Sequence, residues 1–314
     1  MAQKSSPRAP HSDLQVLLFI VALCFTCALL LAGVAYTLRV PQKLAKEFDQ
    51  SKQMLIAAKI LSPSGYFEIL EEDGAMIPAQ FEEATKLLVS VDEEDPPLAT
   101  EDQIQALSDA RIRPLLTNKE GNVFTLEEKD LDLTEYLEKN QKTGYANLPL
   151  KLFYVMLPNK QEAFTKTAKE AADSLDAIYS VVIPVSGFGL WAPIYGFLAV
   201  EPNGDTVIGT TWYEQAETPG LGANISEPNW QKQFYGKLIF QESPGGEVDF
   251  QTAEMGIIVV KGKVQDVYGS SPKGRSAVDG MSGATLTGDG VTDAYRNSLT
   301  PYREFLIKLE EDKS

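Results

Sequence analysis

Histidine and cysteine are scarce in this chain, and their scarcity excludes several kinds of active site. The 314 residues include one histidine, His11, and two cysteines, Cys24 and Cys27. A Ser-His-Asp triad or a Cys-His dyad would have only His11, in the N-terminal tail, as its base. A histidine-rich zinc site or a four-cysteine cluster cannot be assembled from this chain alone. Any redox or group-transfer chemistry therefore has to come from a bound cofactor.

Basic residues are also in the minority. The 28 lysines and arginines against 44 aspartates and glutamates give a formal net charge of −16. Such a surface repels phosphate backbones, so the composition argues against nucleic-acid binding. Hydrophobic residues nevertheless make up 44% of the chain, which excludes global disorder. The length allows one large domain or two small ones beside a membrane anchor.

A long stretch without charge predicts a membrane anchor near the N-terminus. The 25 residues from Leu14 to Leu38 are uncharged and are bracketed by Asp13 and Arg39. As a helix they would measure roughly 37 Å, enough to span a hydrocarbon core of ~30 Å. The stretch is too long for a signal peptide, and it lacks the polar face of a core helix. We expect a cytoplasmic tail over 1–13 and a single transmembrane helix over 14–38.

Two features of this stretch leave open the role of its cysteines and its orientation in the membrane. Cys24 and Cys27 form a CxxC pair, but a redox pair is normally stabilised at a water-accessible helix start, so small apolar helix residues are the simpler interpretation. More of the flanking basic residues follow the stretch than precede it, and this count alone favours a cytoplasmic C-terminal domain. They are Lys4 and Arg8 before it, and Arg39, Lys43, Lys46 and Lys52 after it.

Helical spacing continues beyond the anchor. Apolar residues recur at helical intervals over 42–61, which predicts a juxtamembrane helix within 39–65. This helix either continues the transmembrane span or restarts after Pro41. A Ser-Pro-Ser-Gly sequence follows it and predicts its end.

Residues 66–149 are acidic and mixed in pattern, and we interpret them as a surface elaboration. Within them Thr100 and Gln103 form a capping box, which predicts a short helix that reaches about Ile112. We find no constellation of residues in this segment that would carry chemistry.

The second half of the chain has the pattern of a sheet with covering helices. Short apolar and β-branched runs predict strands, and a Pro-Asn-Gly-Asp turn predicts a hairpin. Helices are expected over 161–175 and from about Gly290 to Leu309, with a break at Pro301. The mixture predicts an α+β fold with a mixed or antiparallel sheet, part of which residues 66–177 supply. The predicted strands are Leu150–Leu157, Ile178–Val185, Tyr195–Val200, Thr206–Tyr213, Lys237–Gln241 and Met255–Lys263.

One segment near the C-terminus has the residues for ligand chemistry. Residues 279–287 read DGMSGATLT, with small residues that allow close approach to the backbone and three hydroxyls. The hydroxyls can hold an oxyanion or cap a helix, and a phosphate is favoured where free N–H groups converge at a helix start. The alternative is an ordinary glycine turn with a capping hydroxyl. The small residues are Gly283 and Ala284, and the hydroxyls are those of Ser282, Thr285 and Thr287.

A loop and a group of aromatic residues add further candidates. The loop reads ETPGLGA from Glu217, and its Pro-Gly pair suits a type II turn. The aromatic residues fall within a stretch of 40 positions and can wall a planar cofactor, although core packing is their commoner use. They are Trp191, Tyr195, Trp212, Tyr213 and Trp230.

Together these segments resemble the family of covalent-FMN subunits, the C subunits, of the Na+-translocating NADH:quinone oxidoreductase. DGMSGATLT resembles the flavin-attachment signature of that family, in which the threonine of SGAT carries FMN through a phosphoester bond. The stretches GLWAPIYGFLAVEPNGDTV and TTWYEQAETPGLGA resemble family segments in the same order. The resemblance is strongest over 178–295 and weaker over 14–61.

The resemblance implies residue roles in an FMN-binding domain over 178–314. Thr285 would carry the covalent FMN, and Asp279 would help to position this acceptor. Residues around the phosphate would be Ser282, Gly283, Ala284 and Thr287. Residues that pack against the flavin would be Glu217, Thr218, Gly220, Leu221 and Gly222, with Trp191 and Lys261 as neighbours. The resemblance implies no catalytic side chain and no metal ligand.

The resemblance also implies a function and a location. The chain would be a flavoprotein component of a translocase that oxidises NADH, reduces ubiquinone and exports Na+, and it would relay electrons through its FMN. Its partners would be the other membrane and peripheral members of an assembly of six subunits and a flavin transferase that uses FAD as the FMN donor. In this family the domain lies outside the cytoplasmic membrane. We therefore expect a single-pass protein of the bacterial inner membrane with a periplasmic FMN domain, against the charge count.

Three alternatives stay open. The nearest is the flavinylated subunit of a related Rnf-type electron transport complex, which shares SGAT and ETPGLG-like segments. The second is an anchored binding or adhesion module without a cofactor. The third is a hydrolase that uses Ser282, which the absence of a suitable histidine disfavours.

Overall fold

The computed structural model describes residues 13–71, 74–92 and 95–311. His11 and almost all of the predicted tail over 1–13 lie outside the described residues. The chain divides into two compact units, residues 1–49 and 50–314.

The first unit, where it is described, consists of helix α1 (Asp13–Ala57), which runs on into the second unit. Its apolar stretch has a mean hydropathy of 2.8, and no part of this stretch is buried by the protein. By length and composition the helix can cross a membrane, which confirms the predicted N-terminal apolar helix. The helix continues through Pro41 without a break, so the juxtamembrane helix is an extension of the same helix.

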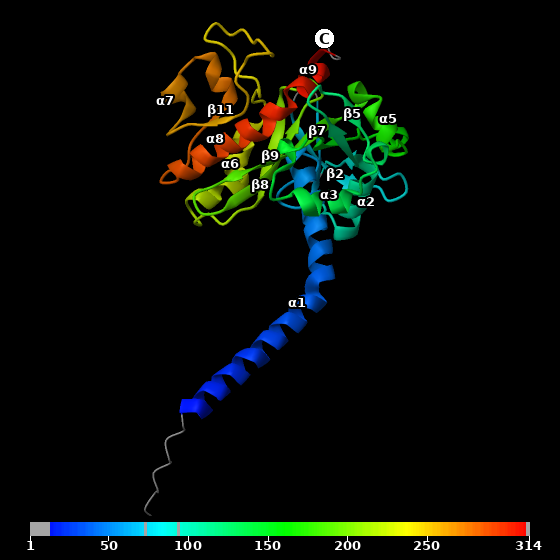
Figure 1. The fold of residues 1–314 in the computed structure, drawn as a ribbon. Coiled ribbons are helices and arrows are strands. Elements are labelled where there is room, and N and C mark those ends of the chain that lie inside the picture. Colours follow the sequence, from blue (N-terminus) through cyan, green and yellow to red (C-terminus); the bar gives the residue numbers. More distant parts are fainter. Residues whose placement is uncertain (1–12, 72–73, 93–94, 312–314) are drawn as a thin grey trace, which may run out of the picture. The chain divides into compact units, whose positions relative to one another are not determined.

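The second unit is built around a six-stranded antiparallel sheet (Figure 1). From β6 onward, each strand pairs in antiparallel orientation with the next strand along the chain. The interior strands β6, β7 and β8 are mostly buried. In pairing order the strands are β5 (Val123–Phe124), β4 (Ile112–Thr117), β6 (Lys151–Met156), β7 (Ser180–Phe188), β8 (Pro193–Val200) and β9 (Val207–Glu214).

Two smaller sheets and a set of helices complete this unit. A three-stranded antiparallel sheet consists of β1 (Phe67–Leu70), β2 (Met76–Phe81) and β3 (Leu88–Ser90). A two-stranded parallel ribbon pairs β10 (Ile258–Val259) with β11 (Ala277–Val278). The helices are α2 (Glu101–Arg111), α3 (Leu133–Asn140), α4 (Gln161–Phe164), α5 (Ala168–Ala172), α6 (Pro228–Gln231), α7 (Val264–Tyr268), α8 (Thr285–Leu299) and α9 (Arg303–Glu311).

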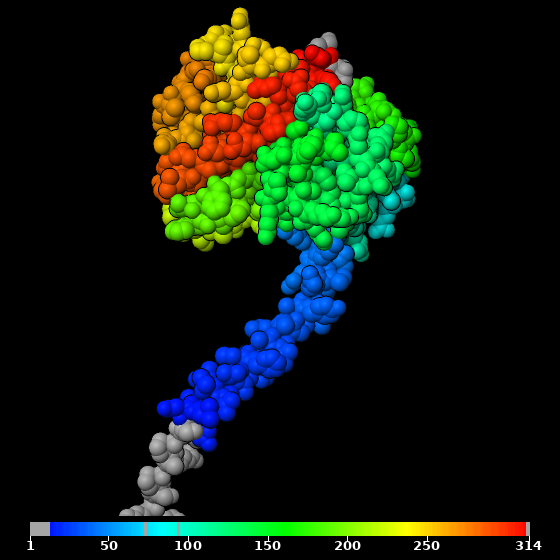
Figure 2. Space-filling model, viewed as in Figure 1, coloured from blue at the N-terminus to red at the C-terminus, as the bar shows by residue number. Residues whose placement is uncertain are grey.

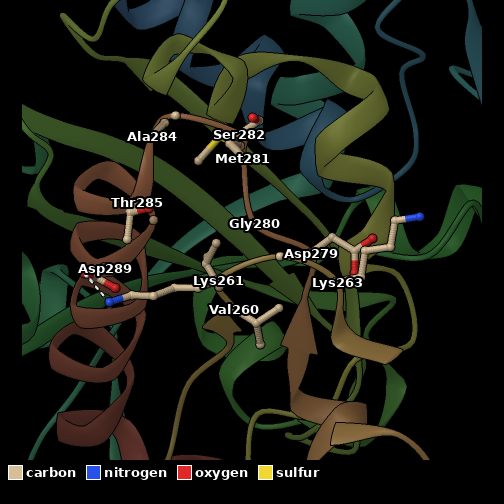
Figure 3. Close-up of a pocket in the computed structure, with 14 residues that line it drawn as sticks. Val260, Lys261, Lys263, Asp279, Gly280, Met281, Ser282, Ala284, Thr285 and Asp289 are labelled. Atoms are coloured by element: carbon tan, nitrogen blue, oxygen red, sulfur yellow. Dashed lines mark ion pairs between the residues drawn. The ribbon is translucent and has the colours of Figure 1, made fainter. Parts of the chain in front are cut away.

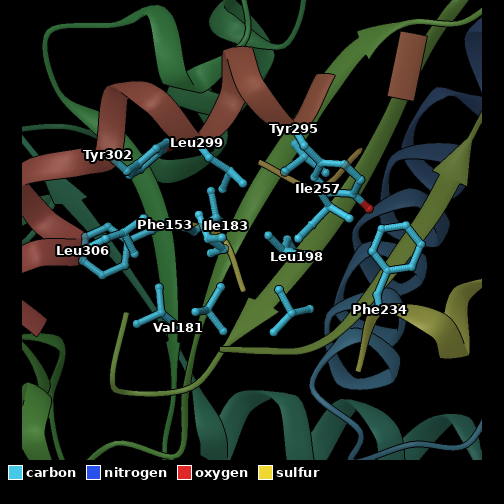
Figure 4. Close-up of a cluster of buried hydrophobic side chains, with 14 of the residues drawn as sticks. Phe153, Val181, Ile183, Leu198, Phe234, Ile257, Tyr295, Leu299, Tyr302 and Leu306 are labelled. Carbon is cyan, nitrogen blue, oxygen red and sulfur yellow. The ribbon is translucent and has the colours of Figure 1, made fainter. Parts of the chain in front are cut away.

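Helices α8 and α9 supply the apolar stripe that covers the sheet. Buried side chains recur at Tyr295, Leu299, Tyr302 and Leu306, a spacing of four, three and four residues that places them on one helical face. Figure 4 shows this face packed against Phe153 and other strand residues. In Figure 2 the two helices cross the surface of the unit between the segment that precedes α8 and the green segment around α3. The end of α8 and helix α9 are thereby fixed to the sheet.

Most of the elements predicted in the second half of the chain are present. The capping box at Thr100 and Gln103 opens α2, and four of the predicted strands correspond to β6, β7, β8 and β9. The predicted fold class, an α+β fold with an antiparallel sheet, is confirmed. The acidic segment 66–149 supplies β4 and β5, so it is more than the surface elaboration that its composition suggested.

Three predicted elements differ from the structure. The helix expected over 161–175 is interrupted, because Thr167 caps a new helix with Glu170 as the reciprocal partner. The strand expected over Met255–Lys263 is reduced to β10, since Gly256 and Gly262 have positive φ angles of 112° and 109°. The strand expected over Lys237–Gln241 forms only isolated bridges.

The C-terminal helix also begins earlier than expected, at Thr285 instead of about Gly290. The glycines in its first two turns are not helix breakers but points of close packing. A Cβ atom on Gly290 would lie 2.3 Å from the carbonyl oxygen of Phe188. The predicted break at Pro301 is present as a short 3-10 turn between α8 and α9.

Candidate functional site

The first turn of α8 presents an exposed hydroxyl group. Thr285 is the first residue of the helix, and Ala284 before it provides no side-chain cap. The first N–H groups of an α-helix have no partner within the helix. Thr285 itself is exposed, and its hydroxyl group forms no hydrogen bond with any residue that the structure describes. The turn therefore offers both a free hydroxyl and free backbone donors.

Thr287, two residues further along, has the opposite environment. It is 1% exposed, and its hydroxyl donates a hydrogen bond to Oε2 of Glu217 at 2.6 Å. Of the two threonines, only Thr285 is available to a ligand from solvent.

A cavity of about 370 Å³ opens beside the first turn of α8 (Figure 3). It lies between the segment that leads into α8 and the segment that follows β10. Six of the residues predicted from the sequence line it together. These are Lys261, Asp279, Ser282, Gly283, Ala284 and Thr285.

Lys261 brings positive charge to this cavity. Its Nζ lies 3.9 Å from Oδ2 of Asp289, and both side chains are largely exposed. Asp289 is four residues after Thr285, so the two share one face of α8. Figure 3 shows the lysine side chain reaching across to this face. An exposed ion pair of this kind adds little stability, so the lysine can exchange its partner for another anion at small cost.

Asp279 is held on the other side of the cavity. Its Oδ1 accepts a hydrogen bond from the backbone N–H of Val264 at 2.8 Å, and its own N–H donates to Gln233. In Figure 3 it lies beside Lys263, across the cavity from Thr285. Its side chain organises the loop that forms the wall of the cavity.

Glu217 lies behind the cavity wall, at a junction of three segments. Its side chain is buried, with 5% of the residue exposed. Oε1 accepts a hydrogen bond from the backbone N–H of Trp191 at 3.0 Å, while Oε2 accepts the bond from Thr287. A Cβ atom on Gly222 would lie 2.7 Å from Oε2, so only glycine fits here. The carboxylate thereby ties the loop over 217–222 to α8.

Two exposed apolar side chains lie in this loop or contact it. Trp191 is 65% exposed, and its Nε1 donates to the hydroxyl of Thr218 at 3.3 Å. Leu221 is 41% exposed, and its Cδ2 would lie 3.0 Å from a Cβ atom on Gly283. Gly283 has a φ of +74°, which favours glycine in any case. Leu221 thus lies beside Gly283, two residues before Thr285 in the chain, and Trp191 is tied to the same loop through Thr218.

The predicted aromatic group does not act as a unit. Trp212 and Trp230 are buried and pack against other core rings, as the core interpretation held. Trp191 is the member that is strongly exposed. Gly220 has a φ of +76° with open space around it, as a turn glycine requires, and it contacts nothing in the cavity.

Comparison with known proteins identifies the relatives of this chain. A family model described as an FMN-binding domain matches residues 189–300. The chain is 48% identical to the C subunit of Na(+)-translocating NADH-quinone reductase from Chlamydia caviae, over 94% of this chain and 92% of the relative. The chain belongs to this C-subunit family. The C subunit from Chlamydia pneumoniae is 44% identical, over 93% of this chain and 90% of the relative.

A solved structure agrees with the fold. The crystal structure of Shewanella oneidensis NqrC matches with a TM-score of 0.50 at 22% identity, over 83% of this chain and 98% of that chain. The predicted family, the fold class and the presence of an FMN-binding domain are confirmed. Both chlamydial relatives are named as subunits of the Na(+)-translocating NADH-quinone reductase, the first of the two complexes considered.

Several residues of this C-subunit site were not predicted from the sequence. Asp289 is the partner of Lys261, and its position four residues after Thr285 was the available signal once the helix start was known. Val259 and Val260 line the cavity from the segment predicted as a strand. Leu286, next to Thr285 in the chain, is a further exposed apolar residue, with 62% of its surface accessible.

Proposed function

We propose that this protein carries FMN in a phosphoester bond to Thr285 and relays electrons within a membrane-bound Na+-translocating NADH-quinone reductase. One observation carries the proposal. The hydroxyl of Thr285 is exposed, without a hydrogen-bond partner among the described residues, and lines a cavity at the first residue of a helix, within the FMN-binding match.

The residues around the cavity suit a phosphate attached at this position. The free N–H groups at the start of α8 and the ammonium group of Lys261 are complementary to its negative charge. Ser282 adds an exposed hydroxyl donor, and Gly283 and Ala284 keep side chains away from the backbone. The site therefore fits the phosphate end of FMN.

Exposed apolar side chains suit the ring system. Trp191, Leu221 and Leu286 are exposed in the first turn of α8 or in and against the loop over 217–222, and apolar surfaces cover planar rings well. When bound, FMN supplies the electron-transfer chemistry that no side chain of this chain offers. The chain's own part is to hold, orient and partly shield it.

Glu217, Asp279 and Thr287 act as positioning residues in this proposal. Their hydrogen bonds fix the loop over 217–222, the cavity wall and the first turn of α8. The contact of Glu217 with the flavin that the resemblance implied is replaced here by a role behind the cavity wall.

Attachment requires a flavin transferase with FAD as the donor. The Thr285 oxygen forms the new bond to phosphorus, the pyrophosphate bond of FAD breaks, the hydroxyl proton is lost and AMP leaves. A noncovalent site with a Kd of ~1 μM would hold its ligand by about 8 kcal/mol and would empty where free FMN is absent. A covalent bond removes that loss.

The location and the partners are part of the same proposal. The apolar helix α1 supports membrane anchoring, and we place the protein in the inner membrane with the FMN domain in the periplasm. The relatives' names support assembly with other subunits of a Na+-translocating quinone reductase. We place the chain in a complex of six subunits that exports Na+.

Fluorescence in a denaturing gel tests the attachment. The full-length chain, expressed with a flavin transferase, should give a fluorescent band at its own mass. Thr285→Val should abolish the band, while Thr285→Ser should keep it because a hydroxyl remains. Thr300→Val, at an exposed threonine at the other end of α8, is the matched control and should stay bright. A bright Thr285→Val band would refute the assignment.

A further inference from the structure

A second cavity lies away from the FMN site, near the other end of α8. It measures about 660 Å³, within the range of small-molecule sites. The turn between β4 and β5, residues 146–151 and Pro301 line it. None of these residues takes part in the site around Thr285.

The walls of this cavity are mainly apolar. Leu148, Pro149, Leu150 and Pro301 contribute hydrocarbon surface. The segment is fixed in place, because the hydroxyl of Tyr136 donates a hydrogen bond to the carbonyl oxygen of Leu150 at 2.6 Å. The cavity is therefore a formed part of the fold with room for an apolar group.

One lysine with a largely buried side chain lines the same cavity. Lys151 is the first residue of β6 and is only 5% exposed. Its ammonium group forms no hydrogen bond, and no ion pair within 4 Å, with any residue in the described part of the chain. Its nitrogen is not among the buried polar atoms without a partner, so the ammonium group reaches solvent while the rest of the side chain is buried. A cation held in this way at an apolar wall can pair with an anion that enters the cavity. Burial lowers the pKa of Lys151, which fits an amine that lacks a close counter-charge.

The nearest acidic group does not fill this role. Glu120 lies in the turn at the cavity wall, and its charge raises the pKa of Lys151, but its carboxylate pairs with Lys119 at 3.5 Å. Both partners of that pair are exposed. Glu120 therefore adds a negative field at the cavity without neutralising Lys151, and this field would oppose a second negative charge on a ligand.

We propose that this cavity binds a small monocarboxylate with an apolar body, whose carboxylate pairs with Lys151 while its hydrocarbon part contacts Leu148, Leu150 and Pro301. The apolar walls favour the hydrocarbon part of the ligand, and the ammonium group of Lys151 favours its carboxylate. The negative field of Glu120 disfavours a second negative charge on the ligand. The site is independent of FMN and of the electron-transfer role.

Competitive acetylation tests the proposal at the residue concerned. The full-length chain in phosphatidylcholine vesicles is treated with trace acetic anhydride, and the acetylation of Lys151 is measured by mass spectrometry relative to Lys139, an exposed lysine on α3. Hexanoate is the probe. Because a bound carboxylate masks the amine, protection should reach about tenfold when hexanoate is at ten times its Kd, and Lys139 should be unchanged.

Three comparators separate the parts of the proposal. Acetate has the charge without the body, 1-hexanol has the body without the charge, and adipate has two charges; none should protect Lys151 as hexanoate does. Glu120→Gln should allow adipate to protect. Equal protection by hexanol or by acetate would overturn the proposal, and so would the absence of protection by hexanoate. A Lys151 that never reacts would also overturn it, because no ligand could then reach the amine.

Discussion

Helix α8 begins with an exposed threonine and ends among buried aromatic rings. In its first turn Thr285 and Leu286 are exposed, and the Thr285 hydroxyl has no partner among the described residues. In its second half Tyr295 and Leu299 are completely buried, and the Ser298 hydroxyl bonds both the N–H and the carbonyl of Ser186. With the proposed attachment at Thr285, one helix would separate two tasks, ligand attachment at its start and fold stability at its end.

The largest effect on stability is expected in the second half. Tyr295 packs against Trp212 and Phe234 with ring centroids 5.4 and 5.5 Å apart. Tyr295→Ala should lower the free energy of unfolding by about 3–5 kcal/mol, measured by urea denaturation of the full chain. Tyr295→Phe keeps the ring and loses the hydroxyl that bonds Thr210, so it should cost about 1 kcal/mol. An alanine variant as stable as the wild type would contradict the stabilising role of the second half of α8.

A site away from α8 gives a second stability effect, one that depends on pH. Burial raises the pKa of Asp205 from 3.8 to about 6, although the backbone N–H groups of Phe240 and Ile239 oppose the shift. The folded protein therefore holds this proton more tightly than the unfolded chain does. The stabilisation is complete below pH ~4 and is lost as the pH rises through about 6, a change of about 3 kcal/mol.

Asp205→Asn isolates this effect, since the amide oxygen can still accept the bond from Phe240. The free energy of unfolding of the wild type relative to this variant should fall between pH 4 and pH 7. Parallel curves over that range would show that Asp205 does not titrate as the structure indicates. The FMN band should be unaffected, because Asp205 lies outside the cavity.

Glu217 is buried in the fold and also bonds the first turn of α8, so it belongs to both regions that are compared. Glu217→Ala leaves the Thr287 hydroxyl and the Trp191 N–H without their acceptor, at a cost of about 2 kcal/mol, and should slow FMN attachment because the first turn loses its support. Glu217→Gln keeps one acceptor oxygen and should have the smaller effect on both. Urea denaturation and the time course of gel fluorescence measure the two effects. Normal attachment in the alanine variant would remove the positioning role.

Thr287→Val sharpens the contrast between neighbouring hydroxyls. It removes a buried hydrogen bond to Glu217 and should cost about 1 kcal/mol in the free energy of unfolding. The fluorescent band should remain, since the proposed attachment residue is Thr285. Loss of the band in a folded protein would place Thr287 in the attachment chemistry.

The smallest stability effect is expected at the attachment residue itself. Thr285→Val removes an exposed hydroxyl without a partner among the described residues, so the free energy of unfolding should change by less than about 0.5 kcal/mol. The same variant should lose all FMN. A large loss of stability would mean that the first turn is not separable from the fold.

Local patterns predicted much of this structure. The capping box at Thr100, the strands of the second half and the N-terminal apolar helix follow from hydrogen-bonding side chains and from periodicity, which act over a few residues. The family resemblance supplied the candidate site residues, and six of these meet in one cavity.

Long-range contacts account for the features that local patterns did not predict. The early start of α8 depends on Gly290 packing against the carbonyl of Phe188, about 100 residues away in the chain. The burial of Glu217 depends in the same way on Trp191 and Thr287. β4 was missed because its Ile-Arg-Pro sequence is a poor strand pattern, and its pairing with β6 decides its structure.

Mass spectrometry of the peptide that contains Thr285 tests the central claim most directly. In protein purified from its native membrane, the peptide should carry the mass of FMN less one water, and fragmentation should place this mass on Thr285. An unmodified peptide from an active complex, or the added mass on Ser282 or Thr287, would contradict the account.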